Sequence, residues 1–395
     1  MGGNAVGAGQ PRRPSQEDVI AAPHVLVAPD KFKGSLTAEQ VATAIAAGIH
    51  EVWPGRAVRT VPVADGGDGT VDAALAAGFT RVGVSAHGPT GEPVDAVIAV
   101  RDGVAVVETA AACGLVRLPG GLLAPMTATS FGAGDLVRAA LDAGCRTIVL
   151  GVGGSASTDG GAGMLQALGA GVFDAAGLSL PHGGGALADV ARVDMSTVDG
   201  RLVGAEIVLA CDVDNPLLGP TGAAATFGPQ KGADPAQVDK LDLALAQWAK
   251  VLGATTGRDV ADASGAGAAG GIGYAALAAL GATRRPGIEL LLELVGFDEQ
   301  LAGAELVITG EGSLDEQTLH GKAPAGVADA ARVAGIPVVA VAGRCLLTNE
   351  RLNEAGIAAA YPLSDLEPDP TRSMADADNL VRQAGARIAR DWLEA

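Results

Sequence analysis

Lysines, carboxylates and glycines gather in several short segments of this sequence, each directly after an apolar run. In the first, Asp30, Lys31, Lys33 and Ser35 follow the run 24–28 and precede an expected helix. Two cations beside a helix N-terminus suit an anionic ligand. A charged surface turn with Ser35 as a helix cap is the alternative interpretation. We expect these four residues to bind substrate or phosphate.

The second segment, 64–70, carries two aspartates three residues apart, Asp65 and Asp68, interleaved with glycines. Such a pair can bind a divalent ion or act as a base beside a phosphate. A glycine-rich turn whose aspartates cap their own backbone is the alternative. We expect Asp65 to be catalytic and Asp68 to be a metal ligand.

The third segment, 151–161, is rich in glycine and hydroxyl residues and includes Gly153, Gly154, Ser155 and Ser157. Successive backbone N–H groups with serine hydroxyls form a phosphate-binding loop. The segment is not a Walker A sequence, because no Gly-Lys-Ser/Thr follows it. We expect these four residues to contact phosphate.

Two weaker segments are 211–216 and 227–233. Asp212 and Asn215 follow an apolar run and offer oxygens to a metal or a hydroxyl, although an Asx turn before proline explains them equally well. Lys231 stands alone between glycines. We expect Asp212 and Lys231 to be catalytic and Asn215 to be a metal ligand.

The last segment, 310–322, again follows an apolar run and contains Glu311, Asp315 and Lys322. Its carboxylates could hold Mg²⁺ and its lysine could meet a phosphate. We expect Glu311 and Lys322 to bind substrate or phosphate and Asp315 to be catalytic. His320 in the same loop is more simply structural or exposed.

The apolar runs before these segments lack alternation, which is typical of strands buried on both faces. They span 24–28, 147–152, 206–210, 305–309 and 337–342. Helical patterns at 37–51, 130–143 and 323–334 separate them, and either Ser35 or Thr37 is expected to cap the first. Strand–helix alternation predicts a parallel sheet with helices on both faces, and ligands then lie at the carboxyl ends of its strands.

Two regions differ from this alternation. Residues 80–115 resemble antiparallel strands with a turn at 101–103, and residues 223–294 mix helices with a Gly/Ala-rich segment. We therefore predict an α/β fold: a discontinuous doubly wound, flavodoxin-like domain into which a second α+β domain is inserted. The first comprises 24–65, 126–210 and 299–395, the second 66–125 and 211–298, and 1–23 are expected to be a disordered leader.

Composition excludes several classes of protein. With 45 acidic and 27 basic residues in 395, the chain has a net charge of −18 and lacks the basic patch of a nucleic-acid-binding protein. Its four scattered cysteines argue against a disulfide framework or zinc site and suit the reducing cytoplasm. The uncharged segment 263–282 consists mostly of Ala and Gly, so no membrane span is expected.

One motif is misleading. Residues 265–270 match the dinucleotide pattern GxGxxG, but no strand is expected before them and no βαβ unit surrounds them. A dinucleotide-dependent hydroxy-acid dehydrogenase is the second hypothesis, but it would need a GxGxxG motif directly after a strand, which is absent. A non-catalytic binding protein for small organic acids is a third, although it would not need so many carboxylates beside phosphate-like loops.

Six motifs together resemble the bacterial glycerate kinase family: APDKFKGSLTAEQVATAI, VPVADGGDGT, GVGGSASTDGGAGMLQALGA, ACDVDNPLLGPTGAAATFGPQKGA, SGAGAAGGIG and LVITGEGSLDEQTLHGKAP. They occur in the family's order over roughly 24–385. Phe32 and Asp68 stand where members often have Tyr and Glu. The resemblance implies ATP as donor, Mg²⁺ as cofactor, D-glycerate as acceptor and 2-phosphoglycerate as product, with the site between two α/β domains.

A kinase is also the hypothesis that best explains where the cations lie. An acidic protein that binds two anions must concentrate its positive charge, and Lys31, Lys33, Lys231 and Lys322 all lie within the glycine-rich motifs. We expect one of Asp65, Asp212 and Asp315 to orient or deprotonate the acceptor hydroxyl, and another to carry Mg²⁺. A cytoplasmic enzyme is expected, with homo-oligomerisation left open.

Overall fold

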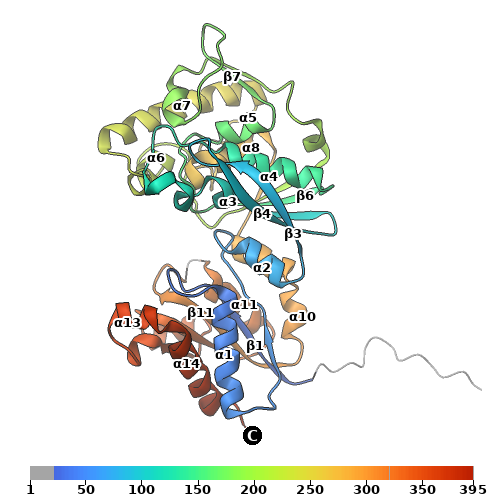
Figure 1. The fold of residues 1–395 in the computed structure, drawn as a ribbon, viewed down its shortest axis with the longest axis vertical. Coiled ribbons are helices and arrows are strands. Elements are labelled where there is room, and N and C mark those ends of the chain that lie inside the picture. The colour runs from blue at the N-terminus through green and yellow to red at the C-terminus, as the bar shows by residue number, and fades with distance from the viewer. Residues whose placement is uncertain (1–21, 320, 395) are drawn as a thin grey trace, which may run out of the picture.

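The computed structural model describes residues 22–319 and 321–394, which form two α/β units stacked end to end (Figure 1). Each unit is built around its own sheet. The expected disordered leader, 1–23, lies outside the described residues except for its last two. The predicted α/β fold class is confirmed.

The first sheet has five parallel strands in the order β13-β12-β11-β1-β2. They are β1 (His24–Pro29), β2 (Val58–Thr60), β11 (Ala304–Leu314), β12 (Val338–Cys345) and β13 (Ala359–Pro362). All six residues of β1 are buried, because helices cover both faces of the sheet.

The two faces of this sheet have separate cores. On one, Val25 and Val27 pack with Ile45 of α1 (Ala38–Val52) and Ile388 of α14 (Ala377–Trp392). On the other, Leu26 packs with helices α9 (Gly287–Leu294) and α11 (Ala323–Val333). The smaller helices of this unit are α10 (Phe297–Leu301), α12 (Asn349–Glu354) and α13 (Pro370–Ala375).

The second sheet is mixed and has six strands in the order β10-β9-β6-β5-β4-β3. They are β3 (Thr80–His87), β4 (Pro93–Arg101), β5 (Val104–Glu108), β6 (Thr147–Gly151), β9 (Glu206–Ala210) and β10 (Thr283–Arg285). β3, β4 and β5 are antiparallel neighbours, as predicted. Asp102 and Gly103, both with positive φ, form the tight turn between β4 and β5.

Helices and a short ribbon complete the second unit. The helices are α3 (Thr109–Cys113), α4 (Phe131–Asp142), α5 (Ala162–Ala167), α6 (Ala223–Phe227), α7 (Pro235–Thr256) and α8 (Ile272–Ala279). β7 (Gly171–Phe173) and β8 (Arg192–Asp194) form the antiparallel ribbon. Among the described residues, no helix is both long and apolar enough to cross a membrane.

The sheet pairing differs from the grouping expected from sequence. Residues 126–210 were assigned to the doubly wound domain, but β6 pairs with β5 and β9 pairs with β6, all within the second sheet. The chain thus leaves the first sheet once and returns once, where two interruptions were expected. A run of buried β-branched residues predicts a strand but does not indicate which sheet the strand joins.

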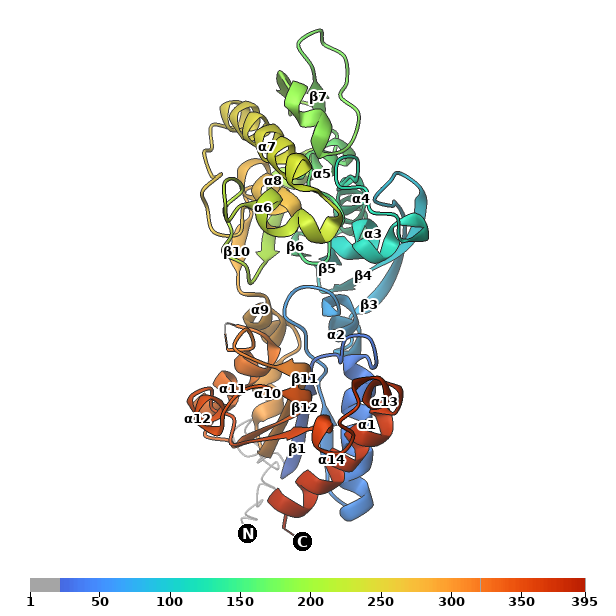
Figure 2. The same cartoon turned by 90° about the vertical axis from the view of Figure 1, so that its left-hand side faces the viewer.

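The chain passes between the two units at two adjacent places (Figure 2). The outgoing segment leads into α2 (Thr70–Ala76), and the returning segment leads from β10 into α9. A Cβ added to Gly66, which has φ +84°, would lie 2.6 Å from the Cα of Gly287. This close backbone contact accounts for glycine at both positions.

Candidate functional site

The loop after β1 directs one lysine toward the neighbouring unit. The Lys31 ammonium donates to the backbone oxygen of Asp68 and lies 3.5 Å from its carboxylate and 3.9 Å from that of Asp30. Burial alone would lower the pKa of Lys31, but these carboxylates and that of Asp65 raise it overall. Lys31 therefore remains a cation among carboxylates.

The other residues of this loop that were expected to bind substrate or phosphate make fewer contacts with the neighbouring unit. Lys33 is exposed, and the Ser35 hydroxyl donates to the backbone oxygen of Phe32, which closes its own turn. The N-cap of α1 is Thr37, whose hydroxyl accepts from the Gln40 N–H in a capping box. The suggestion that Ser35 caps this helix is therefore wrong.

Two glycine-rich loops, one from each sheet, lie against each other. A Cβ added to Gly153 would lie 3.1 Å from the Cα of Gly67, and one added to Gly151 would lie 2.7 Å from the Gly66 oxygen. The loop after β6 and the segment leading into α2 are thus in backbone contact. The loop that holds Gly153 and the loop that holds Asp65 therefore meet where the two units join.

The loop after β6 is hydrogen-bonded to the segment that follows α3. The backbone oxygen of Gly154 accepts from the Leu115 N–H, and Ser155 forms an isolated antiparallel bridge with Gly114. Among the described residues, no hydrogen-bond partner reaches the hydroxyl of Ser157, which is fully buried. Binding of phosphate by the serine hydroxyls would therefore require their rearrangement.

Lys231 supports this loop from inside the second unit. Its side chain is 2% exposed, and its ammonium donates to the Ser155 hydroxyl at 3.1 Å and to the Ser157 backbone oxygen at 2.5 Å. Burial lowers the pKa of Lys231 to about 8, although the negative charge of Asp159 opposes the shift. Its contacts are those of a brace for the loop.

Asp212 lies at the returning segment. Its Oδ1 accepts from the Gly287 N–H at 2.7 Å, so its carboxylate is anchored at the start of α9. Burial raises its pKa to about 7, and the charge of Asp65 adds to the rise. Asn215, by contrast, donates to the Thr221 oxygen at 2.7 Å and braces its own loop.

Glu311, in the first sheet, combines with Lys322 and Thr318. Its Oε1 accepts from the Thr318 hydroxyl, and its Oε2 lies 4.0 Å from the Lys322 ammonium. Burial raises the pKa of Glu311, and these two partners oppose the rise. Asp315 accepts from the Gln317 N–H at 2.9 Å, the contact of an Asx turn.

The negative charge of Asp65 contributes to the raised pKa values of three other carboxyls. Burial raises the pKa of Asp30 to about 7; Lys31 opposes the shift, and Asp65 adds to it. The same charge acts on Asp212 and Glu311. Asp30 follows β1, Glu311 lies within β11 and Asp212 follows β9, so the charge of Asp65 acts on carboxyls from both sheets.

Sequence reasoning missed Glu108, the last residue of β5. It is 8% exposed, and its Oε1 accepts from the Val71 N–H in the first turn of α2 at 2.6 Å. Burial raises its pKa to about 7, and repulsion from Asp68 contributes while Lys31 opposes. A carboxylate at the end of an apolar run was the available signal.

Asp159 lies within the glycine-rich motif after β6, and the sequence did not predict a function for it. Its Oδ2 accepts from the N–H of Ser130 at 2.8 Å, from the Ser130 hydroxyl at 2.9 Å and from the Gly163 N–H at 3.2 Å. These bonds join the starts of α4 and α5 beneath the loop that Lys231 supports. A single buried carboxylate therefore organises two helix termini.

Two further expectations concern metal ions and dinucleotides. Within 22–319 and 321–394, no three His, Cys, Asp or Glu side chains form a preformed metal-binding group. The 265–270 segment follows a loop rather than a strand, and Gly270 packs against the Ser157 backbone oxygen. Its glycines serve close packing, in agreement with the rejection of a dinucleotide fingerprint.

Comparisons with known proteins agree with one another. A sequence model described as the Glycerate kinase family matches residues 25–393. The chain is 43% identical over 369 residues to a glycerate kinase of Halalkalibacterium halodurans, covering 92% of this chain and 97% of that protein. It is 44% identical over 343 residues to the glycerate 2-kinase of Escherichia coli, covering 85% and 89%.

A solved structure is also similar. The crystal structure of a glycerate kinase 2 from Salmonella typhimurium superposes with a TM-score of 0.82 at 42% identity. The match covers 94% of this chain and 98% of that one.

Proposed function

The chain belongs to the glycerate kinase family and is a phosphotransferase with ATP as a substrate; we propose that it phosphorylates D-glycerate where its two sheets meet. The observation that carries the proposal is the meeting of loops from both sheets: Gly66 contacts Gly287, Asp212 accepts from the Gly287 N–H, and Lys31 donates to the backbone oxygen of Asp68. Phosphoryl transfer requires a protein chiefly to position two anions and to offset the charge that develops between them.

Lysines of the first unit would hold the phosphates. Lys31 and Lys322 are both partly exposed, and the ammonium group of each lies within 4.0 Å of a carboxylate. The glycine loop at Gly153 would add backbone N–H groups from the second unit. Lys231 would act through this loop by holding its shape, since its ammonium is already bonded to Ser155 and Ser157.

Asp212 is the group best suited to accept the proton of the acceptor hydroxyl. Its pKa of about 7 is close to physiological pH, where a general base is most effective, and its bond to the Gly287 N–H orients it. Asp315 is less suited, because its carboxylate already accepts from its own turn.

The carboxyls fit Mg²⁺ that arrives with ATP. Mg²⁺ usually keeps several waters and binds one or two carboxylates together with substrate phosphates, so a preformed group of three is not required. Asp30, Asp65 and Glu311 would provide those carboxylates, since their mutual repulsion is relieved by a cation. Bound Mg²⁺ would offset charge on the β- and γ-phosphates.

The 2-hydroxyl is the proposed acceptor, because the E. coli relative is named a glycerate 2-kinase. A cytoplasmic location is supported by four cysteines that are all free. Homo-oligomerisation stays a prediction to be tested by light scattering.

A coupled assay for ADP release tests the proposal. We expect turnover only when ATP, D-glycerate and a divalent ion are all present, with loss in EDTA and recovery on addition of Mg²⁺. Phosphorus NMR of the product should show 2-phosphoglycerate. Absence of turnover with D-glycerate would refute the function, whereas 3-phosphoglycerate would overturn only the choice of hydroxyl.

A further inference from the structure

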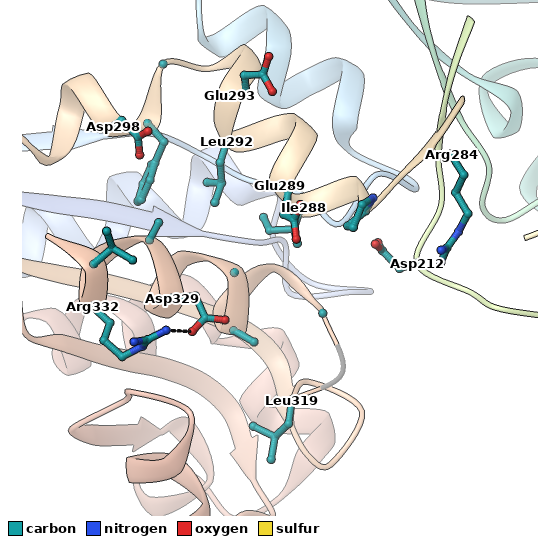
Figure 3. A pocket seen from close by; sticks show the side chains of 18 of the residues that line it. Asp212, Arg284, Ile288, Glu289, Leu292, Glu293, Asp298, Leu319, Asp329 and Arg332 are labelled. Atoms are coloured by element: carbon teal, nitrogen blue, oxygen red, sulfur yellow. Dashed lines mark hydrogen bonds and ion pairs between the residues drawn. The ribbon is translucent and has the colours of Figure 1, made fainter. Parts of the chain in front are cut away.

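A cavity of about 780 Å³ lies between α9 and α11, beside the candidate site (Figure 3). We propose that this cavity holds the nucleoside half of ATP, so that the triphosphate points from it toward Lys322 and Lys31. The inference rests on the proposed kinase function, and it adds where the donor nucleotide lies.

The position of the cavity joins it to the reacting groups. Asp212, whose carboxylate accepts from the Gly287 N–H, lines one end of the cavity (Figure 3). Gly321, which also lines it, immediately precedes Lys322, and Lys322 is 4.0 Å from Glu311. A molecule in the cavity can therefore extend one end to the phosphate-binding lysines.

The charges of the cavity indicate which half of ATP it accepts. Seven carboxylates and two arginines line it. Both arginines are already paired, Arg284 with Asp214 at 2.8 Å and Arg332 with Asp329 at 3.1 Å. A triphosphate or glycerate would be repelled by this lining. Ribose hydroxyls and the adenine amino group, which donate hydrogen bonds, are complementary to carboxylates.

The volume and the apolar residues of the cavity agree with a nucleoside. Ile288 and Leu292 of α9, both labelled in Figure 3, contribute apolar lining, and so do Ala330 and Val333 of α11. Ligand sites typically measure about 300–1,000 Å³ and combine apolar walls with a few polar groups. The volume thus suits a nucleoside and far exceeds what the three-carbon glycerate needs.

A bulky substitution in the lining tests the assignment. Ala330→Phe should fill part of the cavity and raise KM for ATP about tenfold, equivalent to about 1.4 kcal/mol, with KM for D-glycerate unchanged. Ala334→Phe is the matched control, because Ala334 lies at the exposed end of the same helix and does not line the cavity. Adenosine alone should compete with ATP, and Ala330→Phe should weaken this inhibition.

A charge substitution discriminates between nucleoside and phosphate. Glu289→Gln should leave KM for ATP unchanged or raised if a nucleoside occupies the cavity, whereas a fall in KM would place phosphates there and overturn the assignment. Unchanged KM for ATP and unchanged adenosine inhibition in a folded Ala330→Phe variant would also overturn it. Failure of the wild-type protein to phosphorylate D-glycerate would instead refute the proposed function.

Discussion

Replacing Glu108 by Gln should make the protein more stable at alkaline pH. The carboxyl is 8% exposed, and its pKa is raised from 4.5 to about 7, chiefly because burial disfavours the charged form. The folded protein therefore binds this proton more tightly than the unfolded chain does. Stability is greatest below pH 4.5 and falls as the pH rises to about 7, where the buried carboxyl ionises.

The size of the effect follows from the shift. A difference of about 2.5 pKa units, at about 1.36 kcal/mol each, corresponds to ~3 kcal/mol between acidic and alkaline pH. Gln is neutral at every pH, and its amide oxygen can still accept from the Val71 N–H. The stability of the variant relative to the wild type should thus be lowest below pH 4.5 and rise from there to an advantage of up to ~3 kcal/mol above pH 8.

Urea unfolding of both proteins between pH 5 and pH 9 measures this difference. Asp95→Asn is the control, because Asp95 is an exposed carboxylate on β4 of the same sheet. Its stability relative to wild type should not depend on pH. If the Glu108→Gln and wild-type stabilities instead stay parallel across the range, Glu108 titrates like an exposed carboxyl, and the argument from burial is wrong.

Three further predictions concern activity. Lys31→Met should raise KM or lower turnover with the fold retained, because Lys31 bonds to Asp68. Lys33→Met should have a smaller effect, because Lys33 is exposed. Steady-state kinetics of the two variants measure this difference. Gly153→Val should reduce turnover more than Gly153→Ala, since a Cβ there already lies 3.1 Å from Gly67 and larger groups would separate the two loops. Asp212→Asn should lower kcat by about 10²–10⁴-fold, the loss expected when a general base is removed. Asp315→Asn should retain most activity, because Asn can still cap the turn; equal losses at both positions would contradict this distinction.

Local sequence predicted the strands and most of the loops that carry the site. The buried runs became β1, β6 and β9 at nearly the expected bounds, because continuous β-branched segments favour strands covered on both faces. β11 and β12 also begin close to the expected positions, but they continue to Leu314 and Cys345, beyond the predicted ends at 309 and 342. The Asp-Gly turn formed as expected, since its conformation depends on two adjacent residues. The family resemblance and the positions of the lysines within the glycine-rich motifs were also evident from the sequence.

The roles of individual side chains depended on contacts between distant segments. Lys231 and Lys31 both lie in glycine-rich motifs, yet one is buried beneath the serine loop and the other faces the carboxylates. Asp212 and Asp315 both follow apolar runs, but only Asp212 meets a backbone N–H from a helix 75 residues away. Sequence spacing predicts that these side chains follow strands, but it does not predict which distant residues they contact.

The sequence alone therefore determined the fold class, the buried central strands and the chemistry available after them, because these depend on local periodicity and residue type. The short strands β2, β7, β8, β10 and β13 were not predicted. Tertiary structure decided that β6 and β9 join the second sheet, and that Glu108 ends beneath α2 as a buried carboxyl. Both outcomes depend on which surfaces pack together. Burial and the facing charges, which set the pKa of each carboxyl, exist only once the two units are assembled.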